Sequence, residues 1–106
     1  MAKSQDTEEY RDKVNDDGRL NFQLGRNLGK IRSNAKTPGK KAVTFEWLSR
    51  MTTLHHVSIR RFEKGESGMT VANLVRLKDA LGCSWNDLLE GCESVIVKER
   101  KSFYRK

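Results

Sequence analysis

Apolar side chains recur every three or four residues through the middle of the chain, which is the spacing of amphipathic helices. The stretch "FQLGRNLGKIRSNA" places Leu24, Leu28 and Ile31 on one side of such a helix. Two glycines, Gly25 and Gly29, lie inside the same stretch, and glycine lowers helix stability by about 1 kcal/mol relative to alanine. The pattern still predicts a first helix here. The two glycines do not stabilise this helix, so their presence needs another explanation.

Four shorter helices are predicted downstream, in "FEWLSRM", "LHHVSIRRFEKG" and the segments that follow Thr70 and Ser84. Thr44, Thr70 and Ser84 are suited to N-caps because a hydroxyl accepts a hydrogen bond from a free first-turn N–H group. Gly65 and Gly82 are suited to ending the helices before them. The expected inner faces carry Trp47, Leu48, Met51, Ile59, Phe62, Val71, Leu74, Leu77, Leu81, Trp85, Leu88 and Leu89. The sequence thus predicts an all-α fold of five helices around one small core.

The two ends of the chain differ from this helical domain, which we place at residues 22–91. Residues 1–21 have a net charge of −2 and few large apolar side chains. They predict a flexible polar arm, with a small hairpin at "KVNDDGRL" as the alternative. Residues 92–106 form a basic tail that begins with an apolar run, Val95–Val97, typical of an added strand or a dimer contact.

Charge narrows the class of partner. The 106 residues include 21 Lys and Arg against 14 Asp and Glu, which gives a net charge of +7 and favours polyanionic partners. No apolar run approaches the roughly 20 residues that cross a bilayer, and the first residues lack a secretory signal. We therefore expect a cytoplasmic protein that does not bind membranes. Cys83 and Cys92 lack the spacing of a zinc site, so we expect reduced thiols and no metal or other cofactor.

The stretch "LHHVSIRRFEKG" has two distinct faces when it is projected as a helix. Ile59, Phe62 and Glu63 fall on one side. The opposite side carries Val57, Arg60, Arg61 and Lys64, with His56 and Ser58 at its edges. Two short helices joined by "TTL", the second of them cationic, are typical of a helix-turn-helix that places its second helix in the DNA major groove. A solvated charged face is the alternative on this helix alone.

Three segments together resemble the Cro and C1 repressor-type helix-turn-helix domain, also called the XRE family. They are "LGRNLGKIR", "FEKG" and "ALGCSWNDLL", which occur in the family's order within Leu24–Leu89. The resemblance implies the five-helix lambda-repressor-like fold. It also implies an ion pair between Arg32 and Glu63, because these residues match the family's paired positions. A carboxylate on the inner face of a helix would be costly without such a partner.

The same resemblance implies which side chains meet DNA. Base-reading positions match His56, Val57, Ser58, Arg60 and Arg61. Of these, Arg61 is the best candidate for a bidentate contact with guanine. Phosphate contacts are expected from Lys64, from the Thr44 end of the second predicted helix, and from Lys40 and Lys41 in the preceding connection.

Several residues depart from the family pattern. Phe45 occupies a position that is often glutamine, and Thr53 one that is often glycine. Thr52 replaces a usual apolar residue, and Lys78 a usual alanine. Thr53 predicts a turn that either avoids the left-handed region or is slightly reshaped. Phe45, Thr52 and Lys78 predict altered packing or a partner surface, and the long connection "KTPGKK" predicts an extra contact with DNA or protein.

The expected function is a sequence-specific transcriptional regulator, a repressor acting as a homodimer on a near-palindromic operator in double-stranded DNA. The dimer contact would use the last helix and the tail, through Trp85, Val95, Ile96, Val97 and Phe103. An antitoxin-like or accessory DNA-binding subunit with a protein partner is the alternative. An enzyme is not expected, because His55 and His56 should diverge on a helix and no nucleophile or carboxylate pair accompanies them.

Overall fold

The computed structural model describes the backbone of residues 2–96 and the side chains of residues 18–96. Within these residues the chain is all-α and contains no strand, only an isolated antiparallel bridge between Lys36 and Ala42. The helices are α1 (Ala2–Asn34), α2 (Phe45–Thr52), α3 (His56–Glu63), α4 (Val71–Leu81) and α5 (Trp85–Leu88). A further helical stretch covers residues 92–96.

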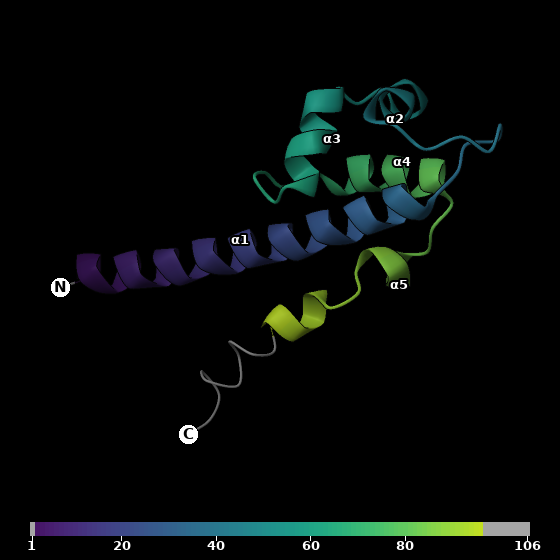
Figure 1. Ribbon diagram of the computed structural model, residues 1–106. Coiled ribbons are helices and arrows are strands. Elements are labelled where there is room, and N and C mark those ends of the chain that lie inside the picture. The colour runs from purple at the N-terminus through teal and green to yellow at the C-terminus, as the bar shows by residue number, and fades with distance from the viewer. Residues whose placement is uncertain (1, 97–106) are drawn as a thin grey trace.

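The long helix α1 organises the arrangement of the others. Helix α3 packs on α1, α2 packs on both α3 and α4, and α5 returns to α1. Figure 1 shows α2, α3 and α4 on one side of α1 and α5 on the other, with the first half of α1 extending past them. The face of α3 that points away from α1 is therefore left at the surface.

The expectation of a flexible arm at residues 1–21 differs from the structure, since the backbone from Ala2 onward belongs to α1. The alternative of a hairpin at "KVNDDGRL" is wrong for the same reason. The segment contains Glu, Gln, Lys and Arg, which are good helix formers, together with four Asp, two Asn and Gly18, which are weaker ones. It also adjoins a helix held by the domain, so it extends an existing helix and avoids the costly first turn. Low apolar content was therefore a poor guide to the conformation of this segment.

The expected strand at Val95–Val97 is wrong for its described part. Val95 and Ile96 are helical and half-buried, because the chain re-forms a helix at Cys92, which is itself buried. Val97, Phe103 and the rest of the tail lie outside the described residues.

The caps of the later helices are those that the sequence predicts. The hydroxyls of Thr44, Thr70 and Ser84 accept from the N–H groups of Trp47, Asn73 and Asp87 respectively. Asp87 also accepts from the Ser84 N–H group, which completes a capping box. Gly82 ends α4 in the left-handed region at φ 67°.

One cluster of side chains forms the core. Its buried members are Leu28, Val43, Leu48, Ile59, Phe62, Leu74, Leu77 and Leu88. Four residues expected on inner faces are instead exposed, namely Met51, Val71, Trp85 and Leu89. Each lies in the first or last turn of its helix or at its C-cap. Thr52 is buried beside Met51, and its hydroxyl donates to the Leu48 carbonyl at 2.6 Å.

Gly25, one of the two glycines in the first predicted helix, lies where the backbone of α3 approaches α1 closely. A Cβ atom on Gly25 would lie 2.0 Å from the carbonyl oxygen of Phe62 and 2.9 Å from that of Glu63. Only a residue without a side chain allows this approach. Gly29, one turn later, faces the Glu63 carboxylate, which a Cβ atom would meet at 3.3 Å.

The Glu63 carboxylate at this crossing binds Arg32 of α1, as the resemblance implies. Arg32 Nε donates to Glu63 Oε2 at 2.6 Å, and Nη2 donates to Oε1 at 3.1 Å. The remaining guanidinium nitrogen, Nη1, donates to the Val43 carbonyl at 3.1 Å. The side chains are only 20% and 10% exposed, so water contributes little to either charge. The pair fixes α3 to α1 through both oxygens of the carboxylate.

We expect Gly25→Ala to lower the free energy of unfolding by about 3 kcal/mol or more, because the added methyl group clashes with helix backbone. Gly18→Ala is the matched control, since Gly18 lies in the same helix with nothing within 4 Å of its Cβ position. That control should raise stability by up to about 1 kcal/mol through helix propensity. Urea denaturation of both variants measures the difference, and equal effects would contradict the close approach.

Removing either partner of the ion pair should also destabilise the fold. Arg32→Ala and Glu63→Ala should each lower the free energy of unfolding by about 2 to 4 kcal/mol, because each leaves a largely buried charge unpaired. Glu66→Ala, at an exposed loop carboxylate nearby in sequence, should change it by less than about 0.5 kcal/mol. Thermal melts that leave both pair variants at the wild-type temperature would rule out a stabilising pair.

Candidate nucleic-acid interface

Side-chain hydroxyl groups stabilise the turn between α2 and α3. Ser49 Oγ donates to the Leu54 carbonyl at 2.5 Å, and the Leu54 N–H group donates to Thr52 Oγ1 at 3.3 Å. Thr53 adopts the left-handed region, at φ 61° and ψ 14°. A β-branched residue there costs roughly 1 to 2 kcal/mol, which the surrounding hydrogen bonds must offset. The alternative that the turn avoids the left-handed region because it lacks glycine is therefore wrong.

Two stacked histidines begin α3. His55 is the N-cap, and its Nδ1 atom accepts from the Val57 N–H group at 3.2 Å. The rings of His55 and His56 are 4.7 Å apart with an interplanar angle of 22°, so the expected divergence of these side chains is wrong. They stack because His55 is a cap with extended backbone, outside the helix whose geometry would have separated them.

The predicted base-reading residues share the outer face of α3. Val57, Ser58, Arg60 and Arg61 are exposed, and His56 is half-buried. Ile59 and Phe62 point the other way and are fully buried in the core. The division of this helix into a core face and a cationic outer face agrees with its sequence pattern.

The predicted phosphate contacts do not all lie together. Lys64 is the C-cap of α3 and is exposed. Lys40 and Lys41 lie in a compact hairpin, in which the Thr37 N–H group donates to the Lys41 carbonyl at 2.9 Å. Figure 1 shows α2 between α3 and the connection that holds this hairpin. Lys64 therefore lies at the end of α3, and the hairpin lysines lie in the connection before α2.

At the N-terminus of α2, the Thr44 hydroxyl is already engaged as the cap, 3.0 Å from the Trp47 nitrogen. The hydroxyl oxygen of Thr44 is therefore used by the helix. What this end of α2 offers a phosphate is the positive end of the helix dipole. Glu46 in the first turn adds a negative charge at the same end, which opposes an anion.

The contact of one aromatic ring with two arginines is a feature that the sequence did not predict. The guanidinium carbon of Arg32 lies 4.1 Å from the centroid of the Phe45 ring, and that of Arg60 lies 5.1 Å from the same centroid. The departure of Phe45 from the family pattern was the available signal. The contacts of Phe45 depend on how α1, α2 and α3 pack together, and a local sequence pattern does not predict that packing.

The amide side chains of α1 were also missed. Asn27 Nδ2 donates to the carbonyls of Leu88 and Glu90, each at 2.8 Å, and Gln23 Nε2 donates to the Glu90 carbonyl at 3.2 Å. These bonds satisfy carbonyls at the end of α5, which a helix leaves without internal partners. They attach α5 to α1 on the side away from α3.

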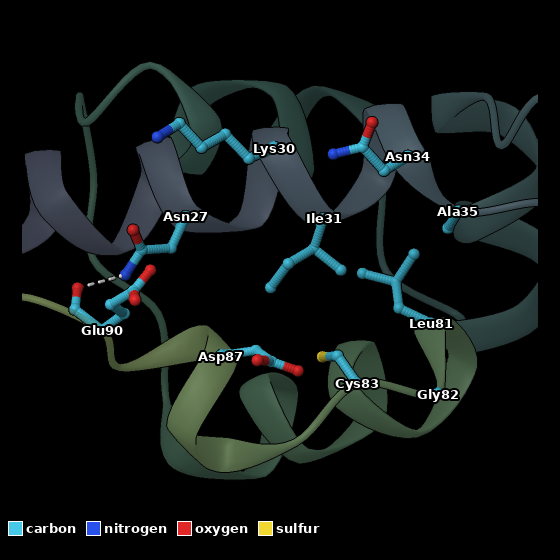
Figure 2. Close-up of a pocket in the computed structure, with 10 residues that line it drawn as sticks. All are labelled: Asn27, Lys30, Ile31, Asn34, Ala35, Leu81, Gly82, Cys83, Asp87 and Glu90. Atoms are coloured by element: carbon cyan, nitrogen blue, oxygen red, sulfur yellow. Dashed lines mark hydrogen bonds between the residues drawn. The ribbon is translucent and has the colours of Figure 1, made fainter.

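A hollow of about 390 Å³ lies between α1 and the α4–α5 segment. Figure 2 shows Ile31 and Leu81 within it, with Asp87 and Cys83 at its edge. Burial raises the pKa of the Cys83 thiol, so the thiol stays protonated at neutral pH. Asp87 is already held by its capping box. No group of three or more His, Cys, Asp or Glu in the described part of the chain is placed to hold a metal ion.

None of the described helices combines the length and apolarity needed to cross a membrane.

Comparison of the chain with protein families, with characterised proteins and with solved structures finds no match. The assignment of a function therefore rests on the geometry of α2 and α3 and on the chemistry of their exposed side chains.

Proposed function

We propose that this chain is a sequence-specific DNA-binding transcriptional regulator with a lambda-repressor-like fold, acting as a repressor. The observation that carries the proposal is the outer face of α3. Arg60 and Arg61 are exposed there beside Val57 and Ser58, on a short helix that follows α2 through a tight turn. An α-helix fits the DNA major groove, and this combination of cations, a hydroxyl and an apolar group matches the chemistry of base edges and phosphates.

The rigidity of α3 supports this role. Base discrimination requires donors held in fixed positions, and the recognition surface must not shift relative to the domain. The Arg32–Glu63 pair and the backbone contact at Gly25 hold the C-terminal end of α3 against α1. The His55 cap and the hydroxyl-bonded turn hold its N-terminal end.

The surrounding charge favours a polyanion as well. The chain has a net charge of +7, and Lys40, Lys41 and Lys64, in the segments that adjoin α2 and α3, are exposed. One domain of this size covers few base pairs, so we propose a homodimer on a near-palindromic operator with half-sites about one helical turn apart.

Selection of double-stranded DNA from a random pool at about 0.15 M salt tests this function. A sequence-specific regulator should enrich one motif with twofold symmetry, and its affinity for that motif should exceed that for unrelated DNA by about 10³-fold or more. A binder that acts by charge alone enriches no motif and weakens equally on all DNA as salt rises. Recovery of no motif would refute the proposal.

Two substitutions should separate base reading from phosphate contact. Arg61→Ala should relax preference at one position of the motif, by about 1 to 3 kcal/mol, because a bidentate contact to guanine is lost. Lys64→Ala should weaken binding to every sequence alike and reduce the slope of log K against log salt by about 1. Lys30→Ala removes the same charge at the hollow beside α5 and should leave the motif unchanged. A motif unaltered by Arg61→Ala would exclude Arg61 as a base contact.

A further inference from the structure

The two neighbouring arginines of α3 have different surroundings. The Arg60 guanidinium lies over the Phe45 ring, with its central carbon 5.1 Å from the ring centroid. Among the described side chains Arg60 has no hydrogen bond or ion pair, and Arg61 has neither these nor a ring contact. Both side chains are exposed. The contact with the Phe45 ring therefore orders Arg60, whereas Arg61 has no such contact.

Phe45 is itself held in place. The ring is half-buried and packs against the core, and Arg32 covers it at 4.1 Å. Arg32 cannot easily move, because it donates two hydrogen bonds to Glu63 and one to the Val43 carbonyl. A phenylalanine has only two side-chain torsions, so a ring fixed in this way is a rigid support.

The contact with the ring uses none of the Arg60 hydrogen-bond donors, since its side chain makes no hydrogen bond within the described residues. A cation over an aromatic ring is attracted to the face of the ring, and the five N–H donors of arginine lie in the plane of the guanidinium. The contact therefore orders Arg60 without using the donors that an anion would need. Ordering before binding reduces the entropy lost when the contact forms.

The position of the ring indicates which part of DNA Arg60 meets. Phe45 is the first residue of α2, so the stacked guanidinium lies beside the N-terminus of that helix. In a helix-turn-helix the first helix crosses the phosphate backbone, whereas the second lies in the major groove. Glu46 in the first turn of α2 opposes a phosphate at this end, and the charge of Arg60 offsets it. The expectation that Arg60 reads a base is therefore the weaker alternative.

We propose that Phe45 is a positioning residue that holds Arg60 as a preorganised clamp for one DNA backbone phosphate beside the α2 N-terminus. The inference rests on the proposed function, because it specifies how that same interface engages DNA. Arg60 supplies a bidentate contact that fixes the register of α3, and base discrimination is left to Arg61 and its neighbours.

A double-mutant cycle on the full chain tests the clamp. Binding to a duplex with the selected motif and to a scrambled duplex is measured for wild type, Arg60→Ala, Phe45→Leu and the double variant. Arg60→Ala should weaken binding to both duplexes about tenfold. Phe45→Leu should weaken it about two- to fivefold. The double variant should be no weaker than Arg60→Ala, because the ring acts through Arg60.

Conservative and unrelated variants serve as controls. Phe45→Tyr keeps the ring face and should bind like wild type. Phe45→Leu combined with Arg61→Ala should show additive losses, since Arg61 does not contact the ring. Circular dichroism melts of every variant establish that binding is compared between folded proteins, because Phe45 also packs on the core.

A measurement without DNA tests the stack itself. Ring-current shifts should move the Arg60 side-chain protons upfield in the NMR spectrum of the free wild-type protein and of Phe45→Tyr, and vanish in Phe45→Leu. Absence of these shifts in wild type overturns the stack. Additive losses for Phe45→Leu and Arg60→Ala, or an Arg60→Ala variant that loses preference at a single base pair, overturn the clamp while the proposed function stands. Ring-current shifts together with failure to select any DNA motif overturn the proposed function and the clamp with it.

Discussion

The close contact between α1 and α3 is the constraint on which the rest of the structure depends. Gly25 lets the backbone of α3 approach α1, and Arg32 and Glu63 join the two helices at the same place. A buried charge pair often contributes less to stability than an apolar contact of the same size, but it permits only one geometry. In this chain the pair specifies the orientation of α3, and apolar burial of Phe62 and its neighbours supplies most of the stability.

Much of the helical domain follows from short-range chemistry, which is why the sequence predicts it. Hydroxyl caps and a left-handed glycine depend on neighbouring backbone groups alone, and Thr70 and Gly82 therefore define α4 correctly. Apolar spacing likewise identifies Leu74 and Leu77 as buried. Failures occur where burial depends on distant segments: Val71 is exposed at the first position of α4, because none of the described elements covers it. The extent of α1 was underestimated because helix extension does not require apolar side chains.

The two faces of α3 were predictable from the sequence, whereas the contacts of its outer face with other helices were not. Periodicity separates the exposed face of α3 from its core face. The stack of Arg60 on Phe45 joins residues of two helices and depends on a third through Arg32. Nor did helical geometry predict that His55 stacks on His56, because capping places His55 outside the helix.

The side-chain amides of Gln23 and Asn27 support α5, the least firmly held of the named helices. They bind the carbonyls at the end of α5, a helix of four residues that is too short to persist unsupported. Only Leu88 of that helix is buried, whereas α3 is fixed by charge, backbone contact and core packing together. Local opening of the α5 segment should therefore require less free energy than unfolding of the whole domain. In hydrogen exchange the amides near α5 would therefore exchange earlier than those of α3.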